Sequence, residues 1–87
     1  MNIELGSYSP DSGLQLNWVP GYELRVATNA DEVVISGNQE GLRSLAHHLL
    51  TLADQRVPAG VHAHMEPGSE LEDDSAPLVV EKASAST

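Results

Sequence analysis

The pattern His-x-His-x-Glu at residues 62–66 carries the most distinctive chemistry in this sequence. Alternate side chains of a β-strand share one face and lie about 6.5–7 Å apart, so His62, His64 and Glu66 would project together. Two imidazoles and a carboxylate suit zinc or another divalent cation if a fourth ligand comes from elsewhere. The same pattern fits a solvated strand face or a face that contacts a partner. We expect no resident metal or other cofactor, and a small metal-binding protein that uses these three residues remains the alternative.

Five acidic side chains gather in the nine residues that begin at the end of this pattern. They are Glu66, Glu70, Glu72, Asp73 and Asp74. The segment lacks the regular ligand spacing and the central glycine of an EF-hand calcium loop. A solvated loop and a docking site for a basic partner are the two interpretations. We predict that these acids form a partner-binding surface together with His62 and His64.

No group of residues in the sequence predicts catalysis. The absence of cysteine excludes disulfides, thiolate chemistry and Cys-ligated zinc. There is no G-x-S-x-G elbow and no phosphate-binding glycine loop, and the acids lie in an apparent loop instead of a cleft. His47 and His48 would diverge by about 100° on a helix and so would not share a ligand. We expect surface polar positions for both, with His48 partly buried beside the apolar stripe. The chain is therefore expected to bind and not to catalyse.

The charge of the chain is strongly negative. Thirteen acidic residues oppose four basic ones, which gives a net charge of −9. Nucleic acid and anionic membranes require clustered basic side chains, so both are excluded as partners, whereas a basic protein would be attracted. The charge would also keep a small protein soluble. No apolar run approaches the roughly 20 residues that cross a bilayer, and the start of the chain lacks signal-peptide features. We expect a cytoplasmic protein that is a monomer or a weak dimer.

Alternation of apolar and polar residues with a period of two predicts a series of β-strands. They cover residues 2–6, 14–18, 22–26 and 33–35, and later residues 61–66 and 78–80. Residues 7–13 are predicted to form a loop because they are rich in serine, proline and glycine. The connections between the early strands are too short for parallel crossovers, so antiparallel pairing is expected.

One amphipathic helix is predicted to follow the first four strands, with Ser36 or Asn38 as its N-cap. Its expected buried stripe is apolar and follows helical spacing. The stripe consists of Leu42, Leu45, Ala46, Leu49, Leu52 and Ala53, with Leu50 at its edge. The opposite side consists of Arg43, Ser44, His47, Thr51 and Asp54. Gly41, in the first turn, costs about 1 kcal/mol relative to alanine, which indicates close packing or a required backbone approach at that position.

These elements predict an α+β fold in the order ββββαββ. A mostly antiparallel sheet would carry the amphipathic helix on one face as a two-layer sandwich, and the other face would be free to bind a partner. We expect one domain over residues 1–82 and a disordered tail over residues 83–87, which is made of small residues.

A family resemblance covers residues 33–82. Residues 37–53 read G-x-x-x-G-L-x-x-L-A-x-H-L-L-x-L-A, and His62-x-His64, Leu71-Glu72, Ser75 and Leu78-Val79-Val80-Glu81 follow. This segment resembles the bacterial immunity protein 32 family. The chain departs from the family pattern at Asp73-Asp74 and Pro77, before the last strand, and its first 32 residues carry no motif of the family.

The resemblance implies a function. Proteins of this family are assigned to polymorphic toxin systems, in which each neutralises a cognate toxin domain, so inhibition by binding is expected. An acidic inhibitor suits a basic toxin such as a nuclease. A regulatory or scaffold module with an unknown partner is the other class that the residues leave open.

Overall fold

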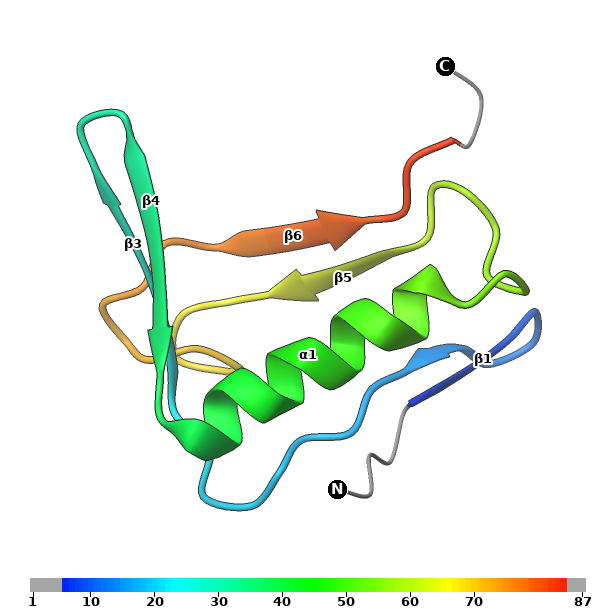
Figure 1. Cartoon of the computed structure of the whole chain (residues 1–87), viewed down its shortest axis with the longest axis horizontal. Coiled ribbons are helices and arrows are strands. Elements are labelled where there is room, and N and C mark those ends of the chain that lie inside the picture. The colour runs from blue at the N-terminus through cyan, green and yellow to red at the C-terminus, as the bar shows by residue number, and fades with distance from the viewer. Residues whose placement is uncertain (1–5, 85–87) are drawn as a thin grey trace.

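Six strands and one helix make up residues 6–84, the part of the chain that the computed structural model describes (Figure 1). The strands before the helix are β1 (Ser7–Ser9), β2 (Gly13–Gln15), β3 (Leu24–Asn29) and β4 (Glu32–Gly37). The helix α1 (Gln39–Ala53) is followed by β5 (His62–Met65) and β6 (Leu78–Glu81). The predicted α+β class and the ββββαββ order are confirmed.

The strands pair as three antiparallel hairpins, β1–β2, β3–β4 and β5–β6. The antiparallel pairing is as predicted, but the strands are distributed over three two-stranded sheets. Figure 1 shows α1 between the β5–β6 hairpin and the segment that contains β1 and β2, while the β3–β4 hairpin projects away from one end of the helix. This arrangement leaves both faces of the projecting hairpin open along much of its length.

The beginning of the chain differs in detail from the prediction. Residues 7–13, predicted to be a loop, form β1 and the turn into β2, with Tyr8 paired to Leu14. Composition favoured a loop, but a hairpin of two three-residue strands needs only a short turn, and Gly13 supplies a positive φ of 75° at its end. The strand predicted at residues 2–6 and the predicted disordered tail lie largely outside the described residues.

The helix starts at an asparagine that also binds the chain before β3. Asn38 Oδ1 accepts hydrogen bonds from Gly41 N at 2.8 Å and from Glu23 N at 2.9 Å. Its Nδ2 donates to Gly21 O at 3.0 Å, and its backbone N–H donates to Glu23 O at 3.2 Å. One side chain therefore caps the helix and fixes the position of the chain that enters β3.

Two glycines make room for this approach. A Cβ atom at Gly37 would lie 2.7 Å from Glu23 O, and one at Gly41 would overlap that oxygen and lie 2.8 Å from the carbonyl carbon. The G-x-x-x-G spacing thus forms a notch for the backbone of Glu23. The close backbone approach expected at Gly41 is confirmed.

The helix buries a different face from the one that its periodicity predicted. Its buried residues are Gly41, Ser44, His47, His48, Thr51 and Leu52. Of the predicted stripe, Leu52 is buried and Leu45 partly buried, whereas Ala46 and Ala53 are exposed. Leu42, Leu49 and Leu50 are 46–48% exposed. The prediction that the leucines form the contact with the sheet is therefore wrong for most of them.

Hydrogen bonds explain why the polar face is buried. Ser44 Oγ accepts from Val19 N at 2.8 Å. Thr51 Oγ1 donates to His47 O at 2.8 Å and accepts from Gly6 N at 3.0 Å. These hydroxyls satisfy backbone groups of the segment before β3 that lies along the helix (Figure 1). A small hydroxyl side chain can be buried at low cost when it is hydrogen-bonded in this way. Hydrophobic periodicity contains no information about such partners and therefore predicts that these residues are exposed.

His48 belongs to an aromatic cluster under the helix. Its side chain is 1% exposed and meets Trp18 edge-on, with ring centroids 4.3 Å apart, and Trp18 stacks on Tyr22 at 4.4 Å. Neither ring nitrogen has a hydrogen-bond partner among the described residues. Burial, with a smaller effect of His47, lowers the pKa of His48 to about 4. The surface position predicted for His47 is wrong, because its side chain is buried, and His48 is fully instead of partly buried.

The apolar core is small and lies between the helix and the hairpins. Its buried members are Leu24, Val26, Leu52, Val57, Ala63, Met65 and Leu71. Ala63 and Met65 alternate with exposed His62 and His64 along β5, as predicted. The core therefore positions the histidine face outward.

Replacing Gly41 with alanine should destabilise the protein. The new Cβ would collide with the backbone of Glu23, an overpacking that we expect to cost about 1–3 kcal/mol. Helix propensity alone would instead stabilise the variant by about 1 kcal/mol. Urea unfolding of Gly41→Ala distinguishes the two by sign, and Ala46→Gly, at an exposed position of the same helix, measures the propensity effect alone. A higher urea midpoint for Gly41→Ala would contradict the notch.

Stability should fall as the pH decreases from 6.5 to about 4. The unfolded chain binds a proton at His48 in this range, whereas the folded chain does not because its pKa is lowered to about 4. The free energy of unfolding should decrease by about 3 kcal/mol over this pH range. Urea midpoints measured between pH 4 and pH 7.5 test this.

A leucine at position 48 should flatten this pH profile. His62→Gln, which removes an exposed histidine, should leave the profile unchanged. Carboxylates with a lowered pKa, at Asp54, Glu70 and Asp74, lose their stabilising effect from about pH 5 downwards, so the slope above about pH 5 is the part of the profile that tests His48. An unchanged slope in His48→Leu would show that another group controls the loss.

Candidate interaction surfaces

The predicted histidine face is present on the outer side of the β5–β6 hairpin. His62, His64 and Glu66 are exposed, and His64 Nε2 lies 2.7 Å from Glu66 Oε1, with about half of each side chain exposed. Across the hairpin, His62 is opposite Glu81 and His64 is opposite Val79, which is 50% exposed. This face is therefore polar and solvent-accessible, with one apolar residue in it.

The predicted ligand trio does not come together as a cluster. His62 Nδ1 lies 3.2 Å from Gly60 O, while His64 pairs with Glu66. Within residues 6–84, no group of three or more histidine, aspartate or glutamate side chains is arranged to hold a metal ion. The geometry at this face is that of a hydrogen-bonded surface pair.

The acidic segment between β5 and β6 is anchored to the rest of the fold. Glu72 N donates to Leu24 O at 3.0 Å, and Ala76 N donates to Val26 O at 2.8 Å. Leu71 is buried in the core between these attachment points. The segment therefore runs along the edge of β3 and presents its acids from a fixed backbone.

Two of its acids have structural partners of their own. Asp74 Oδ1 lies 2.8 Å from Arg25 Nε, and this guanidinium lowers the pKa of Asp74 below its usual range. Glu70 Oε1 accepts from Glu66 N at 2.9 Å, which lowers the pKa of Glu70. By contrast, Glu72 and Asp73 have no ion-pair partner among the described residues. Asp73 is exposed and Glu72 partly buried, so Asp73 is the more available of these two carboxylates.

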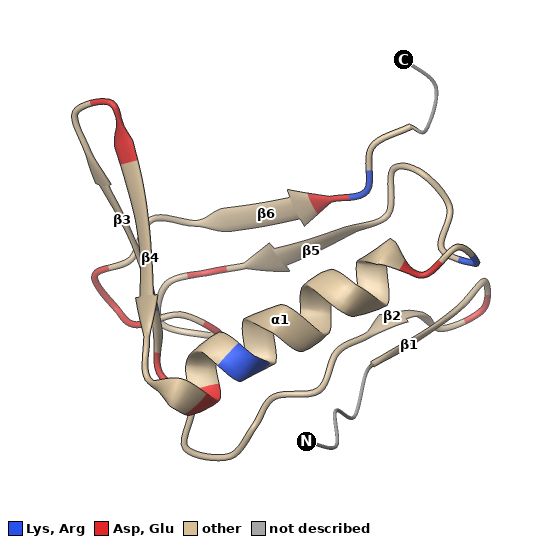
Figure 2. Ribbon diagram, in the orientation of Figure 1, with Lys and Arg blue, Asp and Glu red and all other residues tan. Residues whose placement is uncertain are grey.

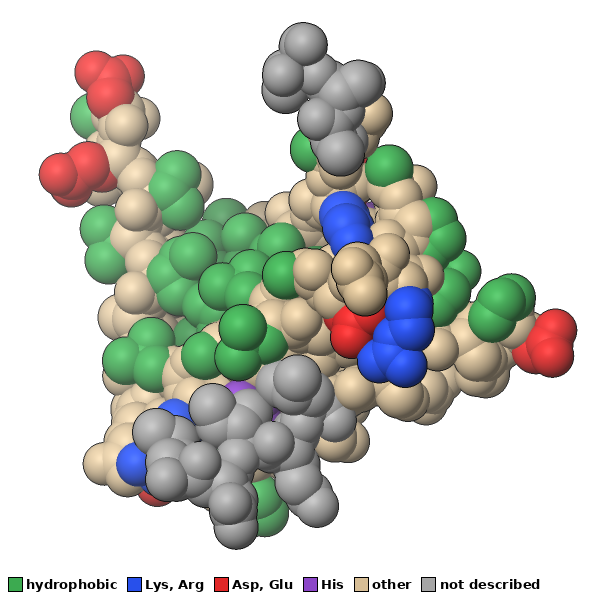
Figure 3. Space-filling view, turned by 45° about the vertical axis from the view of Figure 1, so that its right-hand side comes forward, with side chains coloured by type: hydrophobic (Ala, Val, Ile, Leu, Met, Phe, Trp, Pro, Cys, Tyr) green, Lys and Arg blue, Asp and Glu red, His purple; other side chains and the backbone are tan. Residues whose placement is uncertain are grey.

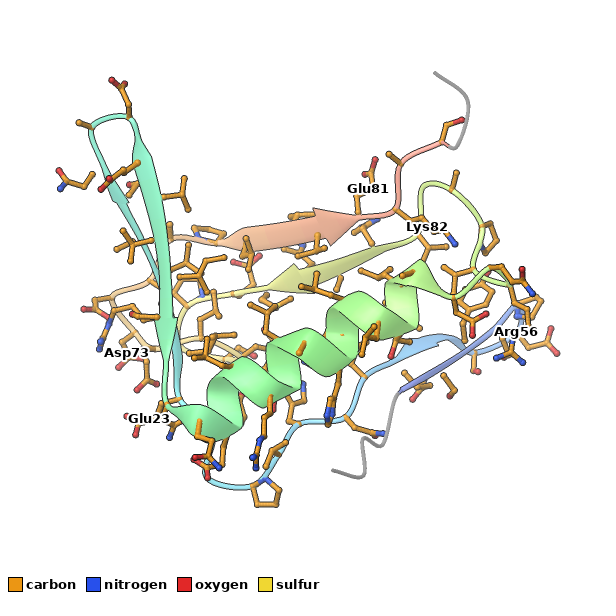
Figure 4. All side chains as sticks on the ribbon, viewed as in Figure 1. Glu23, Arg56, Asp73, Glu81 and Lys82 are labelled. Atoms are coloured by element: carbon orange, nitrogen blue, oxygen red, sulfur yellow. The ribbon has the colours of Figure 1, made fainter. Side chains whose placement is uncertain are left out.

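Glu23 is an acid that sequence reasoning did not connect with this segment. It lines, with Arg25, Asn38 and Glu72, a surface depression of ≈ 270 Å³. Figure 4 shows Glu23 and Asp73 at the same end of the molecule. Only the fold brings Glu23 close to Glu72, because the two residues are far apart in the sequence.

A second exposed surface is apolar and was not predicted. It comprises Leu42, Leu49 and Leu50 of α1 with Val33 and Ile35 of β4, which are 64% and 39% exposed; Val34, 45% exposed, lies on the opposite face of the strand. Val26, which is buried, pairs with Ile35, and Thr28 pairs with Val33, so the inner face of the hairpin extends beyond the core. Figure 3 shows hydrophobic side chains spreading from the hairpin across the middle of the molecule. We call this set the α1–β4 surface.

The α1–β4 surface continues toward the end of the helix. Leu49, Leu52 and Ala53 face Val80 and Lys82 across a shallow groove of ≈ 210 Å³. This surface was not predicted because the helical periodicity of the same leucines indicates burial in the core.

Charges are distributed unevenly over the described residues (Figure 2). Three of the four basic side chains are bound within the fold: Arg25 pairs with Asp74, Arg56 pairs with Asp54 at 2.9 Å, and Lys82 Nζ donates to Asp54 O at 2.6 Å. Many acids have no such partner, so the surface potential is negative.

Comparison with known proteins supplies the family. The model of the family described as Immunity protein 32 matches residues 32–83, from β4 through β6. No curated protein and no solved structure matched the chain. The one helix among residues 6–84 is too short to span a membrane. Because the match covers more than half of the 87 residues, the chain belongs to the immunity protein 32 family.

Proposed function

We propose that this protein neutralises a toxin domain by binding it directly, without catalysing a reaction. The observation that carries the proposal is membership of the immunity protein 32 family. An immunity protein of this kind needs an accessible, complementary surface, and it needs no active site. The exposed acidic and apolar surfaces of this fold meet that requirement.

The chemistry of the surface favours a basic toxin. The chain carries a net charge of −9, and three of its four basic side chains are bound internally. Such a field attracts a positively charged partner and accelerates its association. A nuclease, whose substrate-binding surface must be basic, is the class of toxin that fits this field best.

The acidic segment would guide this association. Glu72 and Asp73 supply carboxylates without internal partners, while Glu70 and Asp74 hold the shape of the segment through their own bonds. Glu66 joins the segment directly to the face that carries His62 and His64. We propose that these seven residues, the predicted partner-binding set, form the charged and polar margin of the contact.

Co-expression with the product of the neighbouring gene tests the function. Rescue of bacterial growth together with a stable purified complex would support neutralisation by binding. Toxicity that persists when both proteins are expressed and folded would reject the proposal for that partner. A catalytically inactivated toxin domain makes the complex accessible to binding measurements.

Charge reversal at Asp73 should slow the association with the toxin. Asp73→Lys removes an attractive charge without breaking an ion pair within the described residues, and we expect the association rate constant to fall about three- to tenfold at low salt. The difference should shrink as salt is added, because screening removes long-range attraction. Stopped-flow or surface-plasmon kinetics at two ionic strengths would measure it.

Asp11→Lys is the matched control for this experiment. It changes the net charge of the protein by the same amount, and Asp11 is an exposed residue in the β1–β2 turn. Figure 1 shows this turn at the opposite end of the molecule from the segment between β5 and β6. Equal slowing by both variants would mean that only the net charge matters and that the acidic segment has no special role.

A further inference from the structure

We infer that the α1–β4 surface is the apolar centre of the toxin contact and that it takes a protein partner with an apolar patch and a basic margin. The inference rests on the proposed function and specifies its interface. The acidic segment would then mainly determine the association rate constant, and the α1–β4 surface would mainly determine the dissociation rate constant.

The leucine side of α1 has the pattern of a face that is covered by another element, but it is exposed in the isolated chain. Leu42, Leu49 and Leu50 follow the spacing of a buried stripe, and yet they are nearly half exposed, while the polar side of the same helix is buried. Exposed apolar surface of this extent in a small, highly charged protein is typical of an interaction site. Within residues 6–84, these leucines therefore form an apolar helix face that no other segment fully covers.

Strand β4 points to the same conclusion independently. Val33, Val34 and Ile35 are consecutive, so both faces of the strand are apolar, as in strands that are covered on both sides. Within residues 6–84, no backbone hydrogen bond joins these three residues to any segment other than β3. Exposed edge strands are usually protected by lysine, proline or a bulge, and β4 carries neither lysine nor proline.

The charges around this surface identify the occupant. Asp31 and Glu32 stand at the tip of the hairpin, Glu40 at the start of the helix and Glu81 at the end of β6 (Figures 2 and 4). The positive charge nearest to Glu81 along the chain, Lys82, is bonded to Asp54 O. A second copy of this chain would bring the same acids and another net charge of −9 to the contact, which opposes self-association. A partner with a basic margin instead complements the acids and covers the leucines.

Single substitutions can test the surface without touching the core. Leu49→Asp and Val33→Asp introduce a charge at exposed positions of the α1–β4 surface. Val79→Asp makes the same change on the β5–β6 outer face, where the wild-type residue is equally exposed. The probe is the inactivated toxin domain encoded by the neighbouring gene, and the readouts are the Kd and the dissociation rate constant. Circular dichroism and the urea midpoint verify the fold of each variant.

We expect Leu49→Asp and Val33→Asp each to raise the Kd by about 100-fold or more, mainly through faster dissociation. Val79→Asp adds its charge beside His64, at the proposed margin of the contact, and should change the dissociation rate constant by no more than about threefold. Tight binding by both surface variants, or a loss confined to Val79→Asp, would overturn the inference. If either aspartate variant fails to fold, Leu49→Ser and Leu50→Ser make the same comparison with a milder change.

Three further outcomes distinguish this inference from the proposed function. A wild-type protein that neither rescues growth nor binds the toxin domain would reject the function and the interface together. Sedimentation that shows a wild-type dimer converted to a monomer by Leu49→Asp would identify a second copy as the occupant and overturn the assignment to the toxin. Wild-type rescue that the Leu49→Asp and Val33→Asp proteins retain would reject the interface alone.

Discussion

The backbone of Glu23, seated between Gly37 and Gly41, is the constraint on which the arrangement of this protein depends. Asn38 accepts from Glu23 N and from Gly41 N through the same oxygen, so the helix cap and the entry to β3 form one joint. The absence of side chains at the two glycines lets the chains approach within backbone distance. Because the joint lies at one end of α1, it fixes both the direction of the helix and the angle at which the β3–β4 hairpin leaves it.

The burial of the helix follows from this direction. Once the first turn is attached to Glu23, the side of α1 that carries Ser44, His48 and Thr51 faces the segment that contains β1 and β2. Among the described strands, β1 and β2 pair only with each other. The hydroxyls of Thr51 and Ser44 accept hydrogen bonds from the backbone N–H groups of Gly6 and Val19 in this segment. The leucines are left on the outside as a consequence. The residues matched by the family, 32–83, contain Gly37, Asn38 and Gly41 of the joint and the leucine face, whereas Glu23 and the segment that covers the polar face lie outside the match.

The two exposed surfaces suit different stages of binding. Long-range attraction depends on net charge and on acids that are not neutralised internally, and the anchored segment after β5 presents such acids from a rigid backbone. Residence depends on desolvated apolar contact, and among residues 6–84 most of the large exposed apolar side chains belong to α1 and β4. An inhibitor without catalytic groups must obtain its entire effect from these two contributions, so a small acidic fold with an exposed leucine face is physically suited to that task.

Much of this molecule could be predicted from sequence alone because local signals decide it. Turn residues and alternation of period two identified the β3–β4 hairpin, strand β5 with its outward histidines, and strand β6. Asn38 was one of the two predicted N-caps. The glycine cost at Gly41 correctly indicated a close approach. These features depend on backbone preferences and on neighbours within a few residues.

The tertiary structure alone decided which side of the helix is covered. Periodicity assumes that apolar side chains are buried and polar ones exposed, but Ser44 and Thr51 are buried because distant backbone groups bond to them, and His48 is buried against Trp18. The pairing of Asp74 with Arg25 and the proximity of Glu23 to Glu72 likewise join residues about fifty positions apart. No local pattern encodes such partners, since they meet only after the chain has folded.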